Sequence, residues 1–357
     1  MGEVAAGEPV NCSVSGSFHE WLSGAGGSVA ITTYQAGRVA LLGFANGRVT
    51  PVLREFDRPM GMAISGGDLA IATRTEITLF ANAPALAAHY PVGAPEGHDA
   101  LYLPRVTYHT GDLKVHDLGF GNDQLWFVNT LFSCICAVSR EFSFQPTWKP
   151  PFVTRIAPED RCHLNGIAVD AAAPRFATAL GASDLPEGWR AGKARGGVLL
   201  ELESGEAVLT GLSMPHSPRY YQGKLWVLNS GTGELCEVDA TARRCTPVVA
   251  LPGFLRGLGF AGTFALVGMC QIRQSNMFGG LPIQKKFERL LCGVAVVDLR
   301  DGKHIATFEF TSGIHEIFDV RFLPGLSRPM IVAPNSPDAR RGITSPAVAY
   351  WYGTDAE

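Results

Sequence analysis

The sequence has no long apolar run and no excess of charge of one sign. No run of about 18 apolar residues occurs, so no membrane-spanning helix is expected. The 30 basic and 33 acidic residues are interspersed and leave a net charge of −3. This gives no basic footprint for nucleic acid or for an anionic membrane. The N-terminus also lacks the basic start and apolar segment of a secretory signal peptide. We therefore expect a cytoplasmic protein with neither nucleic acid nor membrane as a partner, and its oligomeric state stays open.

Common catalytic motifs are missing as well. There is no G-x-S-x-G elbow, no Walker A loop, no H-E-x-x-H pair and no convincing dinucleotide fingerprint. The chain has eight cysteines but no C-x-x-C spacing, which argues against a zinc knuckle or a redox turn. Cys134 and Cys136 share one strand face. In a cytosolic protein we expect such thiols to be buried, reduced and structural.

A repeated design is present instead. No helical period persists, while 41 glycines and 23 prolines make turns frequent and 46% of the residues are hydrophobic, which favours one large all-β domain. Segments such as "RYYQGKLWVLNSGTGELCEVD" alternate strands with glycine turns and form most of a four-stranded blade. Such units must stack to bury their apolar faces. We predict a β-propeller of four-stranded blades, six most plausibly and seven as the alternative. Residues 1–17 are expected to be a flexible segment, 18–340 the propeller, and 341–357 a terminal segment that is a candidate for closing it.

Three of the repeats place a histidine just before a short β-type run, at His116, His163 and His216. In a propeller the first strand of each blade lines the channel, so its start meets the end of the second strand on one face. Asn129 and Asn229 end second strands. We therefore expect these five residues at one mouth of the channel. Imidazoles suit divalent Zn, Fe or Cu, with an open position for water or substrate. His315 opens a similar unit and is a candidate fourth ligand.

Other candidates lie near the fourth histidine and in long insertions. Glu316 and Asp319 are interpreted as a base or as carboxylates that orient an imidazole. Arginines in the insertions and strands are candidate anchors for a carboxylate. The full set of candidate catalytic groups is Glu316, Asp319, Arg190 and Asp184. The candidate substrate-binding residues are Asn129, Asn229, Arg256, His98, His109, Trp189 and Arg273. The structural alternative is a solvated loop, or histidines that only hydrogen-bond the backbone where blades meet.

Several segments resemble a known family. "CHLNGIAVD", "LSMPHSPRYYQGKLWVLNSGTGEL", "LPGFLRGLGF", "CGVAVVDL" and "EIFDVRFLPG" look like a bacterial conserved-hypothetical family, a domain of unknown function sometimes joined to tetratricopeptide repeats. The resemblance covers about Trp21 to Pro334 and implies no activity. More distantly, the blades are similar to NHL-repeat and regucalcin/gluconolactonase propellers, which include metal-dependent lactonases and a peptidyl-hydroxyglycine lyase with histidine-bound zinc. That resemblance implies a propeller with an axial metal. The gluconolactonase set of carboxylate and Asn ligands is not evident, because histidines occupy the entry positions.

Two function classes follow from the sequence. The first is a metal-dependent enzyme acting on a small metabolite or peptide, by a lyase, hydrolase, isomerase or oxygen-using reaction. The second is a non-catalytic propeller that binds a ligand or protein and whose histidines are structural. Tightly bound metal that depends on these histidines would separate the two classes.

Overall fold

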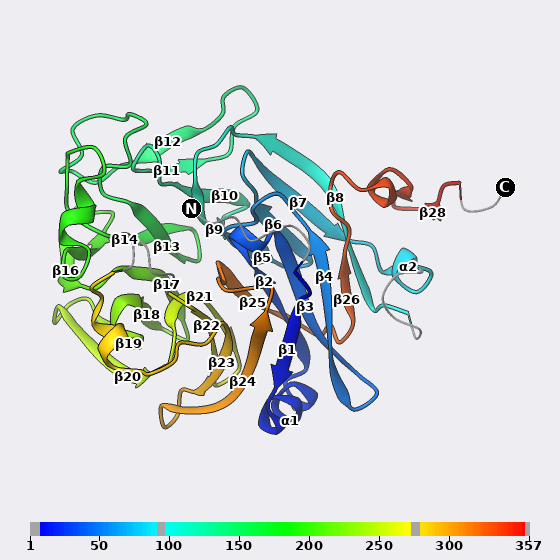
Figure 1. Ribbon diagram of the computed structural model, residues 1–357. Helices are drawn as coiled ribbons and strands as arrows, with labels where there is room; N and C mark the ends of the chain where they lie inside the picture. The colour runs from blue at the N-terminus through cyan, green and yellow to red at the C-terminus, as the bar shows by residue number, and fades with distance from the viewer. Residues whose placement is uncertain (1–7, 91–96, 273–278, 354–357) are drawn as a thin grey trace.

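The computed structural model of the protein describes residues 8–90, 97–272 and 279–353. Within these ranges the chain forms six sheets of four antiparallel strands, two of which gain a fifth strand. Figure 1 shows the sheets arranged around a central axis. Their innermost strands contact one another in a closed ring, in the order β25, β5, β9, β13, β17 and β21. The predicted all-β propeller with six four-stranded blades is therefore confirmed.

The blades are numbered here from the one that contains the N-terminal strands. Blade 1 contains β25 (Asp319–Pro324), β2 (Gly27–Thr32), β3 (Arg38–Ala45) and β4 (Arg48–Glu55). Blade 2 contains β5 (Met62–Ser65), β6 (Asp68–Ala72), β7 (Glu76–Asn82) and β8 (Ala100–His109). Blade 3 contains β9 (Val115–Gly121), β10 (Gln124–Asn129), β11 (Cys134–Ala137) and β12 (Gln145–Trp148).

The other three blades follow in chain order. Blade 4 contains β13 (Leu164–Asp170), β14 (Ala173–Ala179), β15 (Gly197–Glu201) and β16 (Ala207–Leu212). Blade 5 contains β17 (Pro215–Tyr221), β18 (Lys224–Asn229), β19 (Glu234–Asp239) and β20 (Arg244–Ala250). Blade 6 contains β21 (Phe254–Ala261), β22 (Phe264–Cys270), β23 (Gly293–Asp298) and β24 (Lys303–Ser312).

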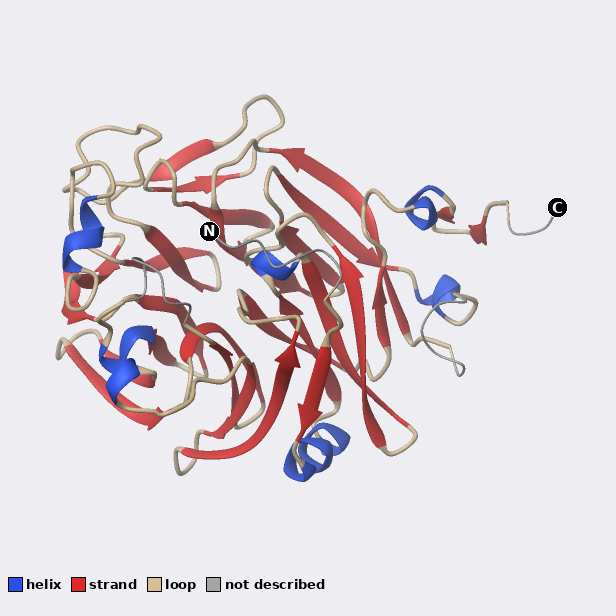
Figure 2. Cartoon of the chain, viewed as in Figure 1, coloured by secondary structure: helices blue, strands red, loops and turns tan. Residues whose placement is uncertain are grey.

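Helices are short and lie between the strands, as Figure 2 shows. The α-helices are α1 (Gly16–Gly24) and α2 (Pro84–Ala87). The 3₁₀ turns are η1 (Tyr34–Ala36), η2 (Gly188–Gly192), η3 (Ser230–Thr232), η4 (Pro282–Lys285) and η5 (Pro337–Arg340). No helix in the described ranges is long and apolar enough to cross a membrane.

Tight hairpins join the first two strands of several blades. In blade 5 the loop between β17 and β18 is Gln222–Gly223, and both residues have positive φ (49° and 74°). Two successive left-handed residues give the type I′ turn, whose twist matches that of the flanking strands. This turn sends β18 straight back along β17. The end of the second strand therefore returns to the channel mouth where the first strand began.

Ring closure is made by a strand from late in the chain. β25 pairs with β2 in antiparallel register, from Thr32 opposite Asp319 to Gly27 opposite Pro324. β1 (Asn11–Val14) joins the N-terminal segment to the propeller by pairing with β24 of blade 6. The expectation that residues 1–17 are merely flexible is therefore wrong for this strand, which finds partners on an open sheet edge.

The C-terminal segment does not close the ring, contrary to the sequence-based expectation. β27 (Gly342–Thr344) and β28 (Ala349–Trp351) form a separate two-stranded sheet, which Figure 1 places outside the propeller beside α2. β26 (Pro329–Ile331) joins blade 2 by pairing in parallel with β8. The edge of β2 is already filled by β25, and residues 342–351 pack outside the ring.

The apolar core lies between neighbouring blades rather than at a single centre. For example, Leu228 of blade 5 packs with Leu255 and Val267 of blade 6, and all three are fully buried. Near the axis the inner strands approach so closely that some positions require glycine. A Cβ on Gly257 would lie 2.6 Å from the backbone nitrogen of Val320 in blade 1. The eight cysteines are free thiols, six of them buried in this core.

Candidate functional site

Three of the predicted histidines lie on adjacent blades at the start of inner strands. His116 is the second residue of β9, His216 is the second residue of β17, and His163 directly precedes β13. The rings of His116 and His163 are in edge contact, with centroids 4.8 Å apart. Both His163 and His216 lower the pKa of His116 electrostatically. The three imidazoles therefore share one electrostatic environment at the channel mouth.

His116 and His216 are held by the same local arrangement. Nδ1 of His116 lies 2.9 Å from the carbonyl oxygen of Lys114, and Nδ1 of His216 lies 2.9 Å from that of Met214. Lys114 and Met214 both have left-handed φ (54° and 47°), which turns each carbonyl toward the ring two residues later. Because a carbonyl only accepts, Nδ1 carries the proton in both rings. Among the described residues nothing hydrogen-bonds their Nε2 atoms, whose lone pairs are left free.

Two hydroxyl groups complete this arrangement, and the sequence analysis missed them. Thr130 Oγ1 lies 2.9 Å from Nδ1 of His116, and Ser230 Oγ lies 3.1 Å from Nδ1 of His216. Each hydroxyl is 14 residues after its histidine. Each also follows the asparagine that ends the second strand, in "VNT" and "LNS". This shared Asn-hydroxyl pair was the signal that could have identified them.

His163 is oriented by a carboxylate instead. Its Nδ1 lies 3.0 Å from both oxygens of Asp160, whose side chain is buried. The indole of Trp189, in η2, packs on the imidazole with ring centroids 4.5 Å apart. His163 itself has left-handed backbone geometry (φ 50°), which is uncommon outside glycine and concentrates at functional positions. An imidazole bonded through Nδ1 to a carboxylate is the usual arrangement behind a metal-ligating histidine.

The surroundings keep two of the imidazoles, His116 and His216, neutral. Burial, together with the neighbouring His163 and Arg256, lowers the pKa of His116 well below its ordinary value. Burial and Arg256 likewise lower the pKa of His216 well below its ordinary value. Neutral imidazole is the form that binds metal ions and accepts hydrogen bonds. At neutral pH these two rings therefore present lone pairs rather than positive charge.

Arg256 and Glu316, both candidates from the sequence, form an ion pair at this mouth. Arg256 lies on β21 and donates from Nη1 to Glu316 Oε1 at 2.9 Å. Its guanidinium carbon lies 3.5 Å from the ring centroid of Phe318. The same phenyl ring packs on His116, with centroids 5.2 Å apart. Phe318 thus connects the guanidinium to the histidine cluster.

His315 has a different environment from the other three histidines. Its Nδ1 lies 2.9 Å from Oε1 of Gln271, and its Nε2 lies 4.0 Å from a carboxylate oxygen of Glu8. Within the described residues, no contact joins His315 to His116, His163 or His216. The structure thus gives the candidate fourth ligand its own polar partners.

Asn129 and Asn229 stand where blade geometry puts them, opposite the first residues of β9 and β17. Their side-chain oxygens accept hydrogen bonds from the backbone. Asn129 Oδ1 accepts from the backbone nitrogen of Phe132, and Asn229 Oδ1 accepts from that of Ser213. These amides build the turns that place the hydroxyl residues next to the histidines.

The insertion between β14 and β15 forms a brace beside His163. Asp184 accepts hydrogen bonds from the backbone nitrogen and the hydroxyl of Thr154, each at 2.8 Å, and pairs with Arg161. These bonds lower the pKa of Asp184 to about 2. Arg190 donates two hydrogen bonds to Glu187 and stacks over Trp189. This network holds Trp189 against the histidine.

The remaining candidates lie elsewhere or outside the described part. His98 is buried, with Nδ1 3.2 Å from the carbonyl oxygen of Arg328, beside the outer strand of blade 2. His109 ends β8 next to Glu76, and its side chain is 80% exposed. Asp319 lies deeper in the channel, as described next. Arg273 falls outside the residues that the structure describes.

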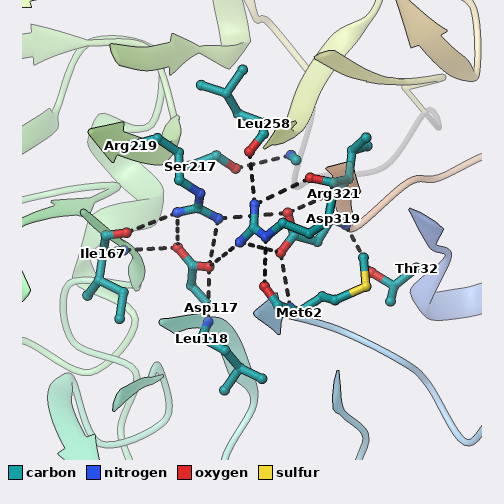
Figure 3. A network of polar contacts seen from close by, with 12 residues as sticks. Thr32, Met62, Asp117, Leu118, Ile167, Ser217, Arg219, Leu258, Asp319 and Arg321 are labelled. Carbon is teal, nitrogen blue, oxygen red and sulfur yellow. Dashed lines mark hydrogen bonds and ion pairs between the residues drawn. The ribbon is translucent and has the colours of Figure 1, made fainter. Parts of the chain in front are cut away.

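A network of four buried charges occupies the channel below the mouth (Figure 3). Asp117, the residue after His116, accepts from both terminal nitrogens of Arg219 at 2.7 and 2.8 Å. Asp319 pairs with Arg321 at 2.9 Å. Cross contacts of 3.6 and 3.7 Å join the two pairs. The sequence analysis treated Asp319 as a group acting on an imidazole, whereas its carboxylate is engaged here.

The network reaches all six blades through backbone groups. Asp117 accepts from the nitrogen of Ile167 in blade 4, and Arg219 donates to the carbonyl of the same residue. Asp319 accepts from the nitrogen of Met62 in blade 2, and Arg321 donates to Leu258 in blade 6. Asp117 and Arg219 themselves belong to blades 3 and 5, and β25 to blade 1. These four side chains therefore tie the inner strands together.

Beyond the network the channel opens into a second depression at the opposite end. This hollow of about 270 Å³ is lined by the far ends of inner strands and by the backs of Arg219 and Arg321. Its aromatic lining comprises Phe120, Tyr220, Tyr221, Phe260 and Phe322. The charge network thus separates an imidazole-lined mouth from an aromatic one.

The donor atoms at the imidazole mouth are not preassembled around one point. In the part of the chain that the structure describes, no three or more His, Cys, Asp or Glu side chains form a group that could hold a metal ion. Any ion at the mouth would therefore have to draw the imidazoles inward. The Nδ1 bonds orient the rings, and the Nε2 atoms are the ones left to bind.

Fold and site define the class of protein as a six-bladed β-propeller with a histidine-lined channel mouth. Its family follows from the sequence match. The model of the family described as Domain of unknown function (DUF4915) matches residues 16–332, and the chain belongs to that family. No protein with a curated description matches the sequence.

Two solved structures share the fold. One is titled "Crystal structure of Nidogen/Laminin Complex"; it has a TM-score of 0.54, is 9% identical, and the match covers 84% of this chain and 99% of that one. The other is a protein of unknown function from Bacteroides caccae, with a TM-score of 0.51, 9% identity, and coverage of 83% of this chain and 98% of that one. At such identities the similarity establishes the propeller alone.

Proposed function

We propose that the protein is a metal-dependent enzyme that holds a divalent ion through the Nε2 atoms of His116, His163 and His216. The observation that carries the proposal is that each of the three imidazoles is hydrogen-bonded through Nδ1, which leaves Nε2 to bind an ion. All three rings are engaged at Nδ1 by a carbonyl or carboxylate oxygen, at 2.9 to 3.0 Å. Such bonds fix the tautomer and raise the basicity of the other nitrogen, as behind metal-ligating histidines.

The electrostatics of the mouth support this reading. Metal binding requires deprotonated imidazole, and burial lowers the pKa of His116 and of His216 well below the ordinary value. The donor set suits zinc, iron or copper. Because the imidazoles do not form a ready-made group, we expect them to close on the ion, with the Nδ1 bonds as pivots.

The remaining groups define what the site could do. A bound ion would polarise a substrate or activate a water molecule. Glu316 stands at the mouth as a candidate base, held by Arg256. The brace with Trp189 would limit access of water on the side of His163. Lyase, hydrolase, isomerase and, with iron or copper, oxygen-using reactions on a small metabolite or peptide are compatible with this arrangement. We place the enzyme in the cytoplasm, which the eight free thiols support.

One observation favours a second candidate function. No preassembled ligand group exists among the described residues, so the Nε2 lone pairs would also suit the donor groups of a bound polar molecule. In that case the protein is a non-catalytic ligand-binding propeller.

Elemental analysis of the purified protein tests the proposal. We expect about one ion per chain, and a loss of about tenfold or more in affinity for the ion in the His116→Ala, His163→Ala and His216→Ala variants. His304→Ala is the matched control, because that histidine lies on β24 with its Nε2 bonded to Ala306 and Thr307. If an alanine variant does not fold, glutamine replaces alanine at that position, as in His216→Gln, because glutamine is closer to histidine in volume. Failure of the folded wild type to hold Zn²⁺, Fe²⁺ or Cu²⁺ after reconstitution would leave only the second candidate.

A further inference from the structure

We infer that Arg256 is the anion anchor of this site and that the ligand is a small molecule carrying a carboxylate. The inference rests on the proposed function for the ion but names the class of substrate. It starts from the hydrogen bonds that Arg256 makes and from those that it leaves unmade. Only Nη1 is used, in the ion pair with Glu316.

The unused donors form one edge of the guanidinium. Nε–H and one N–H of Nη2 point in parallel from that edge, and they match the two oxygens of a carboxylate. Among the described residues, neither Nε nor Nη2 of Arg256 has a hydrogen-bond partner. Neither nitrogen is fully buried, so solvent or a ligand can reach both of them. The residue as a whole is only 9% exposed.

Such a guanidinium is costly unless something binds it. A buried charged donor left without a partner carries a larger desolvation penalty than a neutral one. Phe318 covers one face of the group at 3.5 Å and prevents water from solvating it there. The arrangement holds a planar, charged fork rigidly in place, which lowers the entropic cost of binding an anion.

Its position relates the anchor to the histidines. Phe318 lies against both the guanidinium and the ring of His116. The positive charge of Arg256 lowers the pKa of both His116 and His216, which places the charge near both rings. A ligand bound to this fork would therefore extend toward the Nε2 atoms of the histidines.

Arg190 and Arg161, the two arginines of the brace beside His163, have no such free edge. Arg190 donates from Nε and Nη2 to the two oxygens of Glu187, so its fork is already filled, and its side chain is 41% exposed. Arg161 donates from Nε to Glu159 and from Nη1 to Asp184. Arg175 also stacks on aromatic rings, as Arg256 does, but it pairs with Asp170 at the far end of the β13–β14 hairpin from His163. It is therefore the matched control.

A pair of probes tests the inference, glycolate and glycolamide, which differ only in a carboxylate and an amide. Ligand-observed NMR titrations of Zn²⁺-loaded and of metal-free protein give the two dissociation constants. We expect the wild type to bind glycolate about tenfold more tightly than glycolamide, the effect of one charge-assisted bidentate contact. Arg256→Gln should abolish that preference. Arg256→Lys, which keeps the charge, should retain only part of it, and Arg175→Gln should leave it unchanged.

The outcomes separate this inference from the proposed function. A preference for glycolate that persists in folded Arg256→Gln, or no preference in the wild type, overturns the inference. Metal content measured on the same samples should be unchanged in Arg256→Gln, since the arginine is not a ligand. If the protein holds no ion but still prefers glycolate through Arg256, the inference of an anion anchor stands and the proposed metal site fails. Thermal unfolding of each variant checks that it is folded.

Discussion

The channel contains two polar clusters built on the same inner strands, and they differ in how completely their acceptor atoms are engaged. In the middle, Asp117 and Asp319 each accept from arginine and from backbone nitrogens of two blades. At the mouth, the hydrogen bonds that His116 and His216 make to described residues are all at Nδ1. His116 and Asp117 are adjacent in the sequence. Two adjacent residues thus belong to different clusters: Asp117 to the one that ties the blades together, and His116 to the one with atoms left to bind a ligand.

The comparison shows how a propeller separates stability from function. Removal of one partner from a buried charge pair is strongly destabilising, because it leaves the other charge uncompensated. Open lone pairs at a mouth cost less because solvent or a ligand completes them. We therefore expect substitutions in the middle cluster to reduce folding and substitutions at the mouth to reduce binding.

The largest effect is expected from Asp117→Ala. This change leaves Arg219 buried opposite a void and removes the acceptor for the nitrogens of Leu118 and Ile167. Breaking one side of a buried pair costs about 3–5 kcal/mol, to be measured by chemical denaturation. Arg190→Gln breaks an exposed ion pair and should cost about 0–1 kcal/mol. Equal losses in the two variants would contradict the contrast between the clusters.

A smaller effect is expected from acid on the metal-free protein, because His116 and His216 are kept neutral. Their pKa values in the folded state are lowered by burial, so below about pH 6.5 the unfolded chain binds protons that the folded chain does not. Stability should therefore be fully present at neutral pH and fall as the pH drops. The slope approaches about 1.4 kcal/mol per pH unit for each histidine.

Denaturation in the presence of a chelator between about pH 7 and about pH 5 measures this slope. In His216→Asn the slope of stability against pH should be smaller by the contribution of one histidine. His109→Asn, at a side chain that is 80% exposed, serves as the control and should leave it unchanged. An identical slope in wild type and His216→Asn would show that burial does not hold this imidazole neutral.

The smallest effect on stability, with a clear effect on binding, is expected from the hydroxyl residues. Ser230→Ala removes one of the two groups that orient His216, and loss of such a partner weakens metal affinity by about 10- to 100-fold. The stability cost should stay near 1 kcal/mol. Metal competition titrations give the affinity. Thr78→Val removes a buried hydroxyl from blade 2, and any matching loss of affinity there would rule out a specific role for Ser230.

Local repetition made much of the fold predictable from the sequence. Strands, glycine turns and the histidine positions recur at short range, so the blades and the starts of β9, β13 and β17 could be inferred from each unit separately. Thr130 and Ser230 belong to the same local pattern and could have been recognised from the repeated Asn-hydroxyl pair.

The charge network could not be inferred in that way. Asp117 and Arg219 are 102 residues apart, and Asp319 bonds a backbone nitrogen 257 residues away. Asp319 and Arg321 share β25, but no repeat unit contains both partners of these two bonds, which depend on how the blades face each other across the axis. Ring closure was missed for a related reason. β25 lies in "DVRFLPG", a less regular copy, and only its pairing with β2 shows that it completes the first blade.

The position of β25 also has a consequence for biosynthesis. As the chain emerges from the ribosome, β2 is made early, and its partner is made only when residue 324 has been synthesised. Until then the first blade lacks its axial strand, and Arg219 lacks Asp319 and Arg321 beside it. Pairing over so long a separation is slow and leaves strand edges exposed meanwhile. The nascent chain is therefore an open arc for most of its translation, with the axial edge of β2 unpaired until β25 has been made.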